Sequence, residues 1–210
     1  MYKRQYDIRG KADRDLTDEI IVFIGKAFGT TVLQKGLQKV LIGMDNRQSS
    51  PRINKALTEG LLSTGCQVID LGIVATPIFY YARVKSDTEA GVMITGSHNP
   101  AEDNGLKLAL GAATIYGEEI QDLRRLIEKN VFTKGQGTRS TWDPIPAYKE
   151  MLKEKINLHN KTPKVVVDCG NGTASYFAVD ILTAWGCQVV PLYCEPAVSY
   201  THLDVYKRQR

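Results

Sequence analysis

The sequence predicts a layered α/β fold in which a sheet lies between helices. Helical apolar spacing and short buried apolar runs alternate along residues 16–129, and the runs at 39–44 and 67–71 are the plainest expected strands. A second strand–helix–strand pattern occupies residues 164–193, which is one βαβ unit and too little to cover both faces of a sheet. We therefore expect one layered domain followed by the beginning of a second α/β domain.

The expected helices are supported by their apolar spacing and by the residues at their ends. Residues 16–35 have the spacing of a helix with one apolar face, and Thr17 is placed to cap its first turn. Ser50 and Pro51 begin the next helix, which is expected to end near Gly65. Further helices are expected at residues 77–84, 118–129, 147–156 and 173–185.

The remaining expected strands are short apolar runs bounded by turn residues. They cover residues 89–95, 105–110, 164–168 and 187–193. Residues 133–140 are polar, contain glycine and precede two prolines, and this composition predicts a linker. The expected organisation is a first domain at 6–140, a linker and helix at 141–160, and the start of a second domain at 161–196.

The two ends of the chain resemble each other and differ from the rest. The string Tyr-Lys-Arg-Gln occurs at residues 2–5 and again at 206–209. Structural repeats run to about 20 residues or more, so this is not one. Residues 197–210 also resemble the tails of translated fragments that carry adaptor sequence. We expect residues 1–5 and 197–210 to be non-native, the alternative being a flexible basic tail.

The net charge of +4 does not predict a nucleic-acid partner, because the two ends supply it. Residues 1–5 and 197–210 each contribute +2, so residues 6–196 sum to zero. A nucleic-acid-binding protein carries its basic charge on a folded face. No apolar run reaches the roughly 20 residues of a membrane span, and no apolar signal segment is present. We expect neither a nucleic-acid nor a membrane partner.

The cysteines indicate a reducing compartment. Neither a C-x-x-C pair nor a histidine pattern for zinc occurs around them. We therefore expect reduced thiols and a cytoplasmic location. The four residues are Cys66, Cys169, Cys187 and Cys194.

The segment with the clearest chemistry is the loop Thr-Gly-Ser-His-Asn-Pro at residues 95–100, directly after an expected strand. Its serine, Ser97, precedes Lys107 by ten residues. A phosphorylated serine carries roughly −1.5 to −2 charge, for which backbone N–H groups and a lysine are suitable neighbours. Gly96 is expected to permit a backbone geometry that a side chain would exclude, and Pro100 to stiffen the exit of the loop.

Four segments together carry a resemblance to the α-D-phosphohexomutase family. They are Tyr-Asp-Ile-Arg-Gly at 6–10, Asp-Asn-Arg-Gln-Ser-Ser-Pro at 45–51, the serine loop, and Asn-Gly-Leu-Lys at 104–107. Over residues 6–196 the chain resembles the phosphomannomutase/phosphoglucomutase type. The resemblance implies a three-layer α/β/α first domain with a mixed sheet and a truncated second α/β domain.

The same resemblance implies an activity and roles for individual residues. The activity is reversible phosphoryl transfer between C1 and C6 of mannose phosphate or glucose phosphate, through a phosphoserine and a bisphosphorylated intermediate. Ser97 would carry the phosphoryl group and ligate Mg²⁺ through its phosphate. Lys107 and Arg9 would stabilise the transferred group and assist proton movement, while His98, Arg9 and Tyr6 would bind the sugar. Supporting roles are implied for Asn99, Arg47 and Ser49.

The chain also departs from the family's pattern. The metal-binding string Asp-Gly-Asp-Gly-Asp-Arg is absent, as are the sugar-selecting loop and the distal phosphate loop of this family. Mg²⁺ prefers near-octahedral oxygen coordination, which a phosphoserine alone cannot supply. We therefore expect an N-terminal fragment that is inactive alone, even with Mg²⁺ and a hexose 1,6-bisphosphate activator.

Two unrelated functions fit the residues less well. A serine hydrolase elbow is Gly-x-Ser-x-Gly, but Gly96 directly precedes Ser97, and Asn99 stands where the second glycine belongs. A nucleotide-binding module could use Gly-Asn-Gly at 170–172, but Ser175 replaces the third glycine of that fingerprint.

Two alternatives closer to the family stay open. One is phosphoglucosamine mutase, although residues 6–9 and Gly96 favour the mannose and glucose branch. The other is a non-catalytic module built on the mutase domain, against which the intact Ser97 loop argues.

Overall fold

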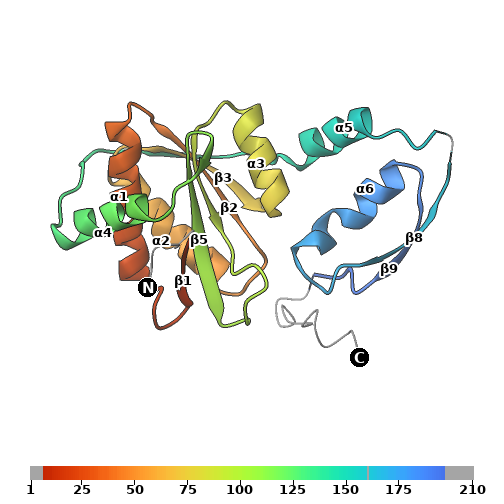
Figure 1. Ribbon diagram of the computed structural model, residues 1–210, viewed down its shortest axis with the longest axis horizontal. Helices are drawn as coiled ribbons and strands as arrows, with labels where there is room; N and C mark the ends of the chain where they lie inside the picture. The colour runs from red at the N-terminus through yellow and green to blue at the C-terminus, as the bar shows by residue number, and fades with distance from the viewer. Residues whose placement is uncertain (1–6, 160, 197–210) are drawn as a thin grey trace.

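The computed structural model describes residues 7–159 and 161–196, which form two α/β units (Figure 1). Tyr6 and the two end segments expected to be non-native lie outside the described residues. The first unit contains a sheet of seven described strands. They are β1 (Ile8–Lys11), β2 (Lys39–Met44), β3 (Gln67–Ile73), β4 (Ala90–Ile94), β5 (Asp103–Leu110), β6 (Ala113–Thr114) and β7 (Thr138–Thr141).

The sheet is mixed, as expected from the family. Its strand order is β1-β5-β4-β2-β3-β7, with β6 paired to β5. The inner strands β4, β2 and β3 are parallel, whereas β5 is antiparallel to both β1 and β4. The carboxyl ends of the parallel strands therefore meet at one edge of the sheet, where the serine loop begins.

Helices cover both faces of this sheet, which confirms the three-layer prediction (Figure 1). On one face lie α1 (Asp18–Gln34), α2 (Ser50–Leu62) and α4 (Glu118–Glu128); on the other lie α3 (Thr76–Lys85) and α5 (Ile145–Lys155). The α1 helix begins as predicted, because the Thr17 hydroxyl accepts the N–H of Ile20 at 3.4 Å. None of the described helices is long and apolar enough to cross a membrane.

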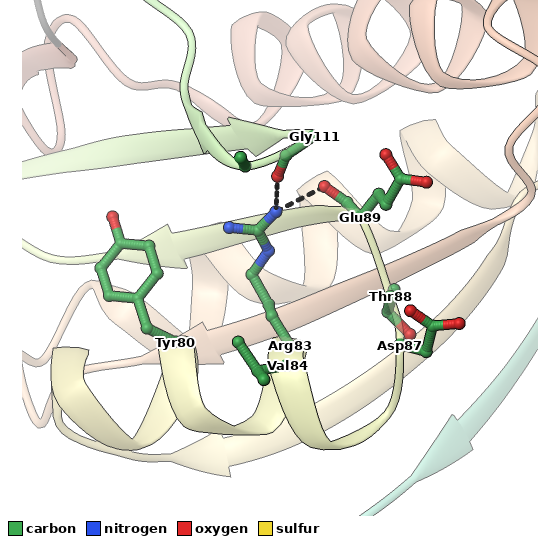
Figure 2. A pocket seen from close by; sticks show the side chains of 8 residues that line it. Tyr80, Arg83, Val84, Asp87, Thr88, Glu89 and Gly111 are labelled. Atoms are coloured by element: carbon green, nitrogen blue, oxygen red, sulfur yellow. Dashed lines mark hydrogen bonds between the residues drawn. The ribbon is translucent and has the colours of Figure 1, made fainter.

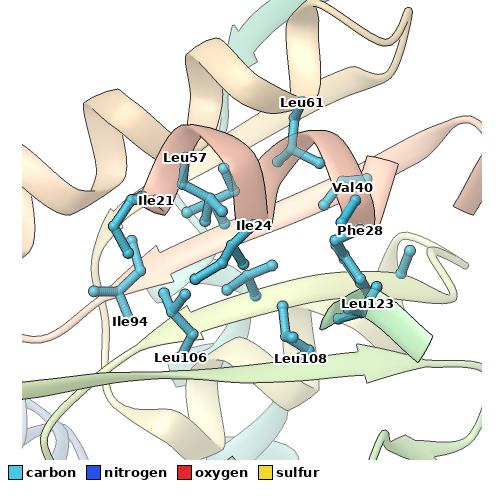
Figure 3. Packing of buried hydrophobic residues seen from close by; sticks show 14 of the residues in the cluster. Ile21, Ile24, Phe28, Val40, Leu57, Leu61, Ile94, Leu106, Leu108 and Leu123 are labelled. Atoms are coloured by element: carbon cyan, nitrogen blue, oxygen red, sulfur yellow. The ribbon is translucent and has the colours of Figure 1, made fainter. Parts of the chain in front are cut away.

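The core follows the two-residue period of the strands. In β2, Val40 and Ile42 belong to the cluster under α1 and α2, whereas Leu41 belongs to the cluster under α3. Figure 3 shows the first cluster, in which Phe28 of α1 and Leu57 of α2 lie over the sheet. Because the inner strands are covered on both faces, they read as continuous apolar runs in the sequence.

The second unit is the predicted βαβ unit. It contains β8 (Lys164–Asp168), a 3₁₀ turn (Thr173–Tyr176), α6 (Ala178–Ala184) and β9 (Gln188–Leu192), and its two strands are parallel. Phe177 is only 7% exposed and packs into the core cluster under α3 of the first unit. In contrast, Val166 of β8 remains 61% exposed.

Three local predictions were wrong or incomplete. Part of the expected linker is β7, a polar edge strand that pairs with β3; its four residues are exposed, so they have no apolar pattern to detect. The expected helix at 173–185 is interrupted at Phe177, whose φ of −151° is far from the helical value. The β1 strand was not predicted, because only its pairing with β5 orders it.

Candidate active site

Ser97 lies at the exposed tip of the loop that follows β4. Its backbone has φ 55°, in the left-handed region that non-glycine residues seldom adopt. The Ser97 N–H donates to the Thr95 hydroxyl at 2.9 Å, which helps to fix this turn. The Ser97 hydroxyl lies 3.3 Å from Nδ1 of His98, and both side chains are exposed. The loop therefore presents a hydroxyl and an imidazole together to solvent.

The Arg47 guanidinium holds the serine loop by donating hydrogen bonds to backbone carbonyl oxygens of the loop. Its Nη1 donates to the carbonyls of Pro100 at 2.6 Å and Asp103 at 3.0 Å. Its Nη2 donates to the carbonyls of Ser97 at 3.0 Å and Asn99 at 2.8 Å. Arg47 is only 4% exposed. Three of these carbonyls belong to the serine loop and the fourth to the first residue of β5, so the guanidinium holds the loop against the sheet.

Asp45 neutralises this buried guanidinium and joins the loop to α2. Its Oδ2 accepts two hydrogen bonds, one from Nε of Arg47 and one from the backbone N–H of Gly96, each at 3.2 Å. Its Oδ1 accepts the Ser50 hydroxyl at 2.6 Å. Asp45 lies in one of the segments that carry the family resemblance, but no role was predicted for it, because its partner Gly96 is 51 residues away in the chain.

Ser49 supports the start of β5 and does not bond the serine loop directly. The Asn104 amide donates to the hydroxyls of Ser49 at 2.8 Å and Ser50 at 3.0 Å. Asn104 is fully buried, so these bonds satisfy its amide nitrogen.

Gly96 is needed for space, which corrects the expected reason for this glycine. Ser97, and not Gly96, has the left-handed backbone in this loop. A Cβ on Gly96 would lie 2.5 Å from Cζ and Nε of Arg47. The glycine therefore lets the backbone pass directly over the guanidinium.

Asp7 connects two of the predicted cationic residues at the edge of the site. Its Oδ2 accepts a hydrogen bond from Nζ of Lys107 at 3.0 Å and another from Nε of Arg9 at 2.8 Å. Arg9 also reaches the serine loop, since its Nη1 donates to Oδ1 of Asn99 at 3.1 Å. Asp7 was not predicted as a site residue, although it lies in the segment at 6–10 that helped to carry the family resemblance.

The structure thus brings most of the predicted residues to one edge of the sheet. Ser97, His98 and Asn99 share the loop, and Arg9 and Lys107 meet at Asp7. Backbone N–H groups were expected to face a phosphate on Ser97. Those of Ser97 and Gly96 instead donate to the Thr95 hydroxyl and the Asp45 carboxylate. Tyr6, the remaining predicted residue, lies outside the described part of the chain.

Residues 1–134 match the family model described as phosphoglucomutase/phosphomannomutase, alpha/beta/alpha domain I. The chain belongs to the phosphoglucomutase/phosphomannomutase family. It is 45% identical over 192 residues to a phosphomannomutase/phosphoglucomutase of Pseudomonas aeruginosa, and 37% identical over 195 residues to a phosphoglucomutase of Neisseria gonorrhoeae. These alignments cover 91% of this chain but 41% and 42% of the relatives, so the chain spans less than half of their length.

A solved structure gives the same result for the fold. A phosphoglucomutase/phosphomannomutase family protein from Burkholderia thailandensis superposes with a TM-score of 0.89 at 34% sequence identity. The match covers 96% of this chain and 45% of that protein. Both α/β units described above therefore occur in a solved member of the phosphoglucomutase/phosphomannomutase family.

The described residues do not complete a magnesium site of the kind implied by the family resemblance. Within 7–159 and 161–196, no three His, Cys, Asp or Glu side chains gather where they could hold a metal ion. The loop itself offers the Ser97 oxygen, whereas Mg²⁺ requires near-octahedral oxygen coordination. The part of the chain that the structure describes therefore does not form a complete metal centre.

A depression lies at the opposite end of β4 from the serine loop, next to Arg83 of α3 (Figure 2). Nη2 of Arg83 donates to the carbonyls of Glu89 and Gly111, each at 2.6 Å. Arg83 is 7% exposed, and burial lowers its pKa from the usual arginine range. These bonds tie together the far ends of β4 and β5, so Arg83 has a structural role away from the serine loop.

Proposed function

We propose that this chain supplies the phosphoserine-bearing part of an enzyme that moves a phosphoryl group reversibly between C1 and C6 of a hexose phosphate. Mannose phosphate and glucose phosphate are the proposed substrates. The observation that carries the proposal is the exposed hydroxyl of Ser97, on a loop that Arg47 holds through three of its carbonyl groups. Membership of the phosphoglucomutase/phosphomannomutase family supports it.

In the proposed reaction, phosphorylated Ser97 transfers its phosphoryl group to a free hydroxyl of the hexose monophosphate. The Oγ–P bond breaks, a sugar O–P bond forms, and the sugar hydroxyl loses its proton. The product is a hexose 1,6-bisphosphate and a free serine. After the bisphosphate turns over in the site, its other phosphoryl group returns to Ser97 and the isomeric monophosphate leaves.

The residues around Ser97 suit these steps. His98 has its Nδ1 3.3 Å from the Ser97 hydroxyl, which supports the proposal that His98 binds the sugar. Lys107 and Arg9 supply two positive charges, which stabilise the charge of a transferring phosphoryl group. Asp7 holds both of them through one carboxylate oxygen. Lys107 and Arg9 are proposed to assist the movement of the proton from the sugar hydroxyl, which ends on the Ser97 oxygen that the phosphoryl group leaves.

We propose that Mg²⁺ binds this chain only through the phosphate on Ser97. When bound, it would neutralise charge on the transferring group. The ligands that would complete its coordination are not among the described residues, and we propose that the 210-residue chain alone does not turn over substrate. A coupled assay with Mg²⁺ and a hexose 1,6-bisphosphate tests this, and robust turnover by this chain would contradict it.

The experiment that tests the proposal uses a chain extended to the full length of the relatives. After incubation with glucose 1,6-bisphosphate, intact mass should show one phosphoryl group. Trypsin should place it in the peptide at 86–107, and fragmentation should assign it to Ser97. Ser97→Ala should lose the label and several orders of magnitude in kcat, with little change in Tm. A phosphate on another residue, or near-native turnover by Ser97→Ala, would refute the mechanism.

A further inference from the structure

Two cysteines of the second unit lie in contact at the carboxyl ends of its strands. Cys169 directly follows β8, and its N–H donates to the carbonyl of Leu192 in β9 at 3.1 Å. Cys194 follows β9, and its Sγ lies 3.2 Å from Sγ of Cys169. A disulfide requires about 2.05 Å between its sulfurs. The two thiols are therefore about one ångström from bonding distance in the folded chain.

The other two cysteines have no such relationship. Cys66 is fully buried in the core of the first unit, where it contacts the Thr64 hydroxyl and the Gly29 carbonyl. Cys187 comes just before β9, at the opposite end of that strand from Cys194. The chain thus provides one juxtaposed pair and two internal controls.

We propose that Cys169 and Cys194 form a reversible oxidation site, at which a two-electron oxidant of the peroxide class converts the two thiols into a disulfide. In the first step, the Cys194 sulfur attacks a peroxide oxygen, and the O–O bond breaks to give a sulfenic acid and one water. In the second step, Cys169 displaces the sulfenic oxygen as a second water and the S–S bond forms. The sulfurs together lose two electrons and two protons, and one peroxide is reduced.

The surroundings of the pair assign this order of attack. Cys194 lines an open depression together with Asn171, Tyr193 and Glu195, so a small oxidant can reach its sulfur. Burial, and then the neighbouring Cys194, raise the pKa of Cys169 to about 11. A thiol with a raised pKa forms less of the reactive thiolate, which together with the open position of Cys194 favours Cys169 as the resolving thiol.

The disulfide would tie the ends of the two parallel strands together. It would close a loop over residues 169–194, which includes α6 and all of β9. It would also fix the segment leading to Asn171, whose carbonyl accepts the side-chain amide of Asn46 from the first unit at 3.1 Å. Oxidation should therefore raise the Tm of the second unit. This inference does not depend on the proposed function, because its readout is a covalent bond.

The test treats the folded 210-residue chain with hydrogen peroxide and removes the oxidant. The chain is then unfolded in urea so that the buried Cys66 is accessible, free thiols are blocked with N-ethylmaleimide, and intact mass is measured. We expect two blocked thiols and a loss of about 2 Da, the mass of two hydrogens, reversed by dithiothreitol. Trypsin leaves three cysteines in one peptide, since neither lysine nor arginine occurs within 165–206. Chymotrypsin can separate them by cleaving after Tyr176, Trp185 and Tyr193, and should yield a linked pair containing Cys169 and Cys194.

Variants decide whether the pairing is specific. Cys194→Ser and Cys169→Ser should each abolish the cross-link, whereas Cys187→Ser should keep it. Cys194→Ser alone decides the question if Cys169→Ser does not fold. In urea, where the fold no longer selects the pair, the same treatment should link Cys169 to Cys187 as readily as to Cys194. Absence of the 169–194 link in the folded chain, or a native mixture equal to that in urea, would overturn the proposal.

Discussion

The guanidinium of Arg47 occupies the space that a side chain on Gly96 would need. A Cβ there would lie 2.5 Å from Cζ of Arg47, and the arginine cannot swing aside without breaking its buried bonds to Asp45 and to the serine loop. The two positions act as one structural unit, although 48 residues of sequence lie between them.

Gly96→Ala should therefore destabilise the fold through overpacking, by about 1–3 kcal/mol in the free energy of unfolding measured in urea. The decisive control is the double variant with Arg47→Ala. Removing the guanidinium removes the clash, so the cost of Gly96→Ala should shrink in that background. Equal costs in both backgrounds would show that the glycine is required for another reason.

Arg47→Met should cost about 3–5 kcal/mol, because it leaves Asp45 as a buried unpaired carboxylate and removes the donors to four carbonyls. Arg47→Lys should recover little of this, since one ammonium cannot reproduce the planar fork. Arg124→Met is the matched control; its side chain is 70% exposed and pairs with Glu128, so the change should stay within about 0.5 kcal/mol. Similar losses of unfolding free energy for the Arg47 and Arg124 variants would contradict the role of Arg47 in holding the serine loop.

Asp7→Asn should weaken catalysis in the full-length context without removing a reacting group. Lys107→Ala should lower kcat by roughly 10²–10³-fold, as expected for loss of one charge partner. Asp7→Asn should have a smaller effect, because it leaves both cations present but less well held. Steady-state kinetics check this, with Asp13→Asn as control because the Asp13 side chain is 97% exposed. A full loss with Asp7→Asn would indicate a direct chemical role.

Phe177→Ala should loosen the second unit from the first. The Phe177 ring fills the cluster under α3, and truncating a buried phenylalanine costs about 3–5 kcal/mol. Hydrogen exchange should accelerate across β8 and β9 while β2 and β4 keep their protection. Tyr176→Ala, at a neighbouring side chain that is 40% exposed, should change little. Uniform loss of protection in both units would show that they unfold together.

Asp15 should make stability depend on acid pH. The hydrogen bond from Arg14, and then the N–H of Lys11, lower the pKa of Asp15 from 3.8 to about 2 in the folded chain. A lowered folded pKa stabilises the fold above the unfolded pKa, and this contribution is lost as the pH falls from 3.8 toward 2. The stability difference between the chain and Asp15→Asn should therefore be constant near neutral pH and shrink below about pH 4. A difference independent of pH would refute this.

Local patterns allowed most of the elements to be predicted. The strand at 39–44 and the helix at 118–128 were predicted to within one residue, because apolar periodicity repeats over a few neighbouring residues. Ser97, Lys107 and Arg9 were predicted as site residues because they lie in short segments that carry the family resemblance, and their roles stay predictions. The structure brings Ser97 and Arg9 to the same edge of the sheet, where Arg9 bonds Asn99 of the serine loop.

Contacts between residues that are distant in the sequence were decided only by the tertiary structure. Asp45, Asp7 and the spatial role of Gly96 all depend on groups that lie about 50 to 100 residues away in the sequence. The polar strand β7 and the break at Phe177 depend likewise on what each segment packs against. Periodicity records which residues share a face, whereas a hydrogen bond or a steric contact requires two distant segments to be brought within a few ångströms by folding.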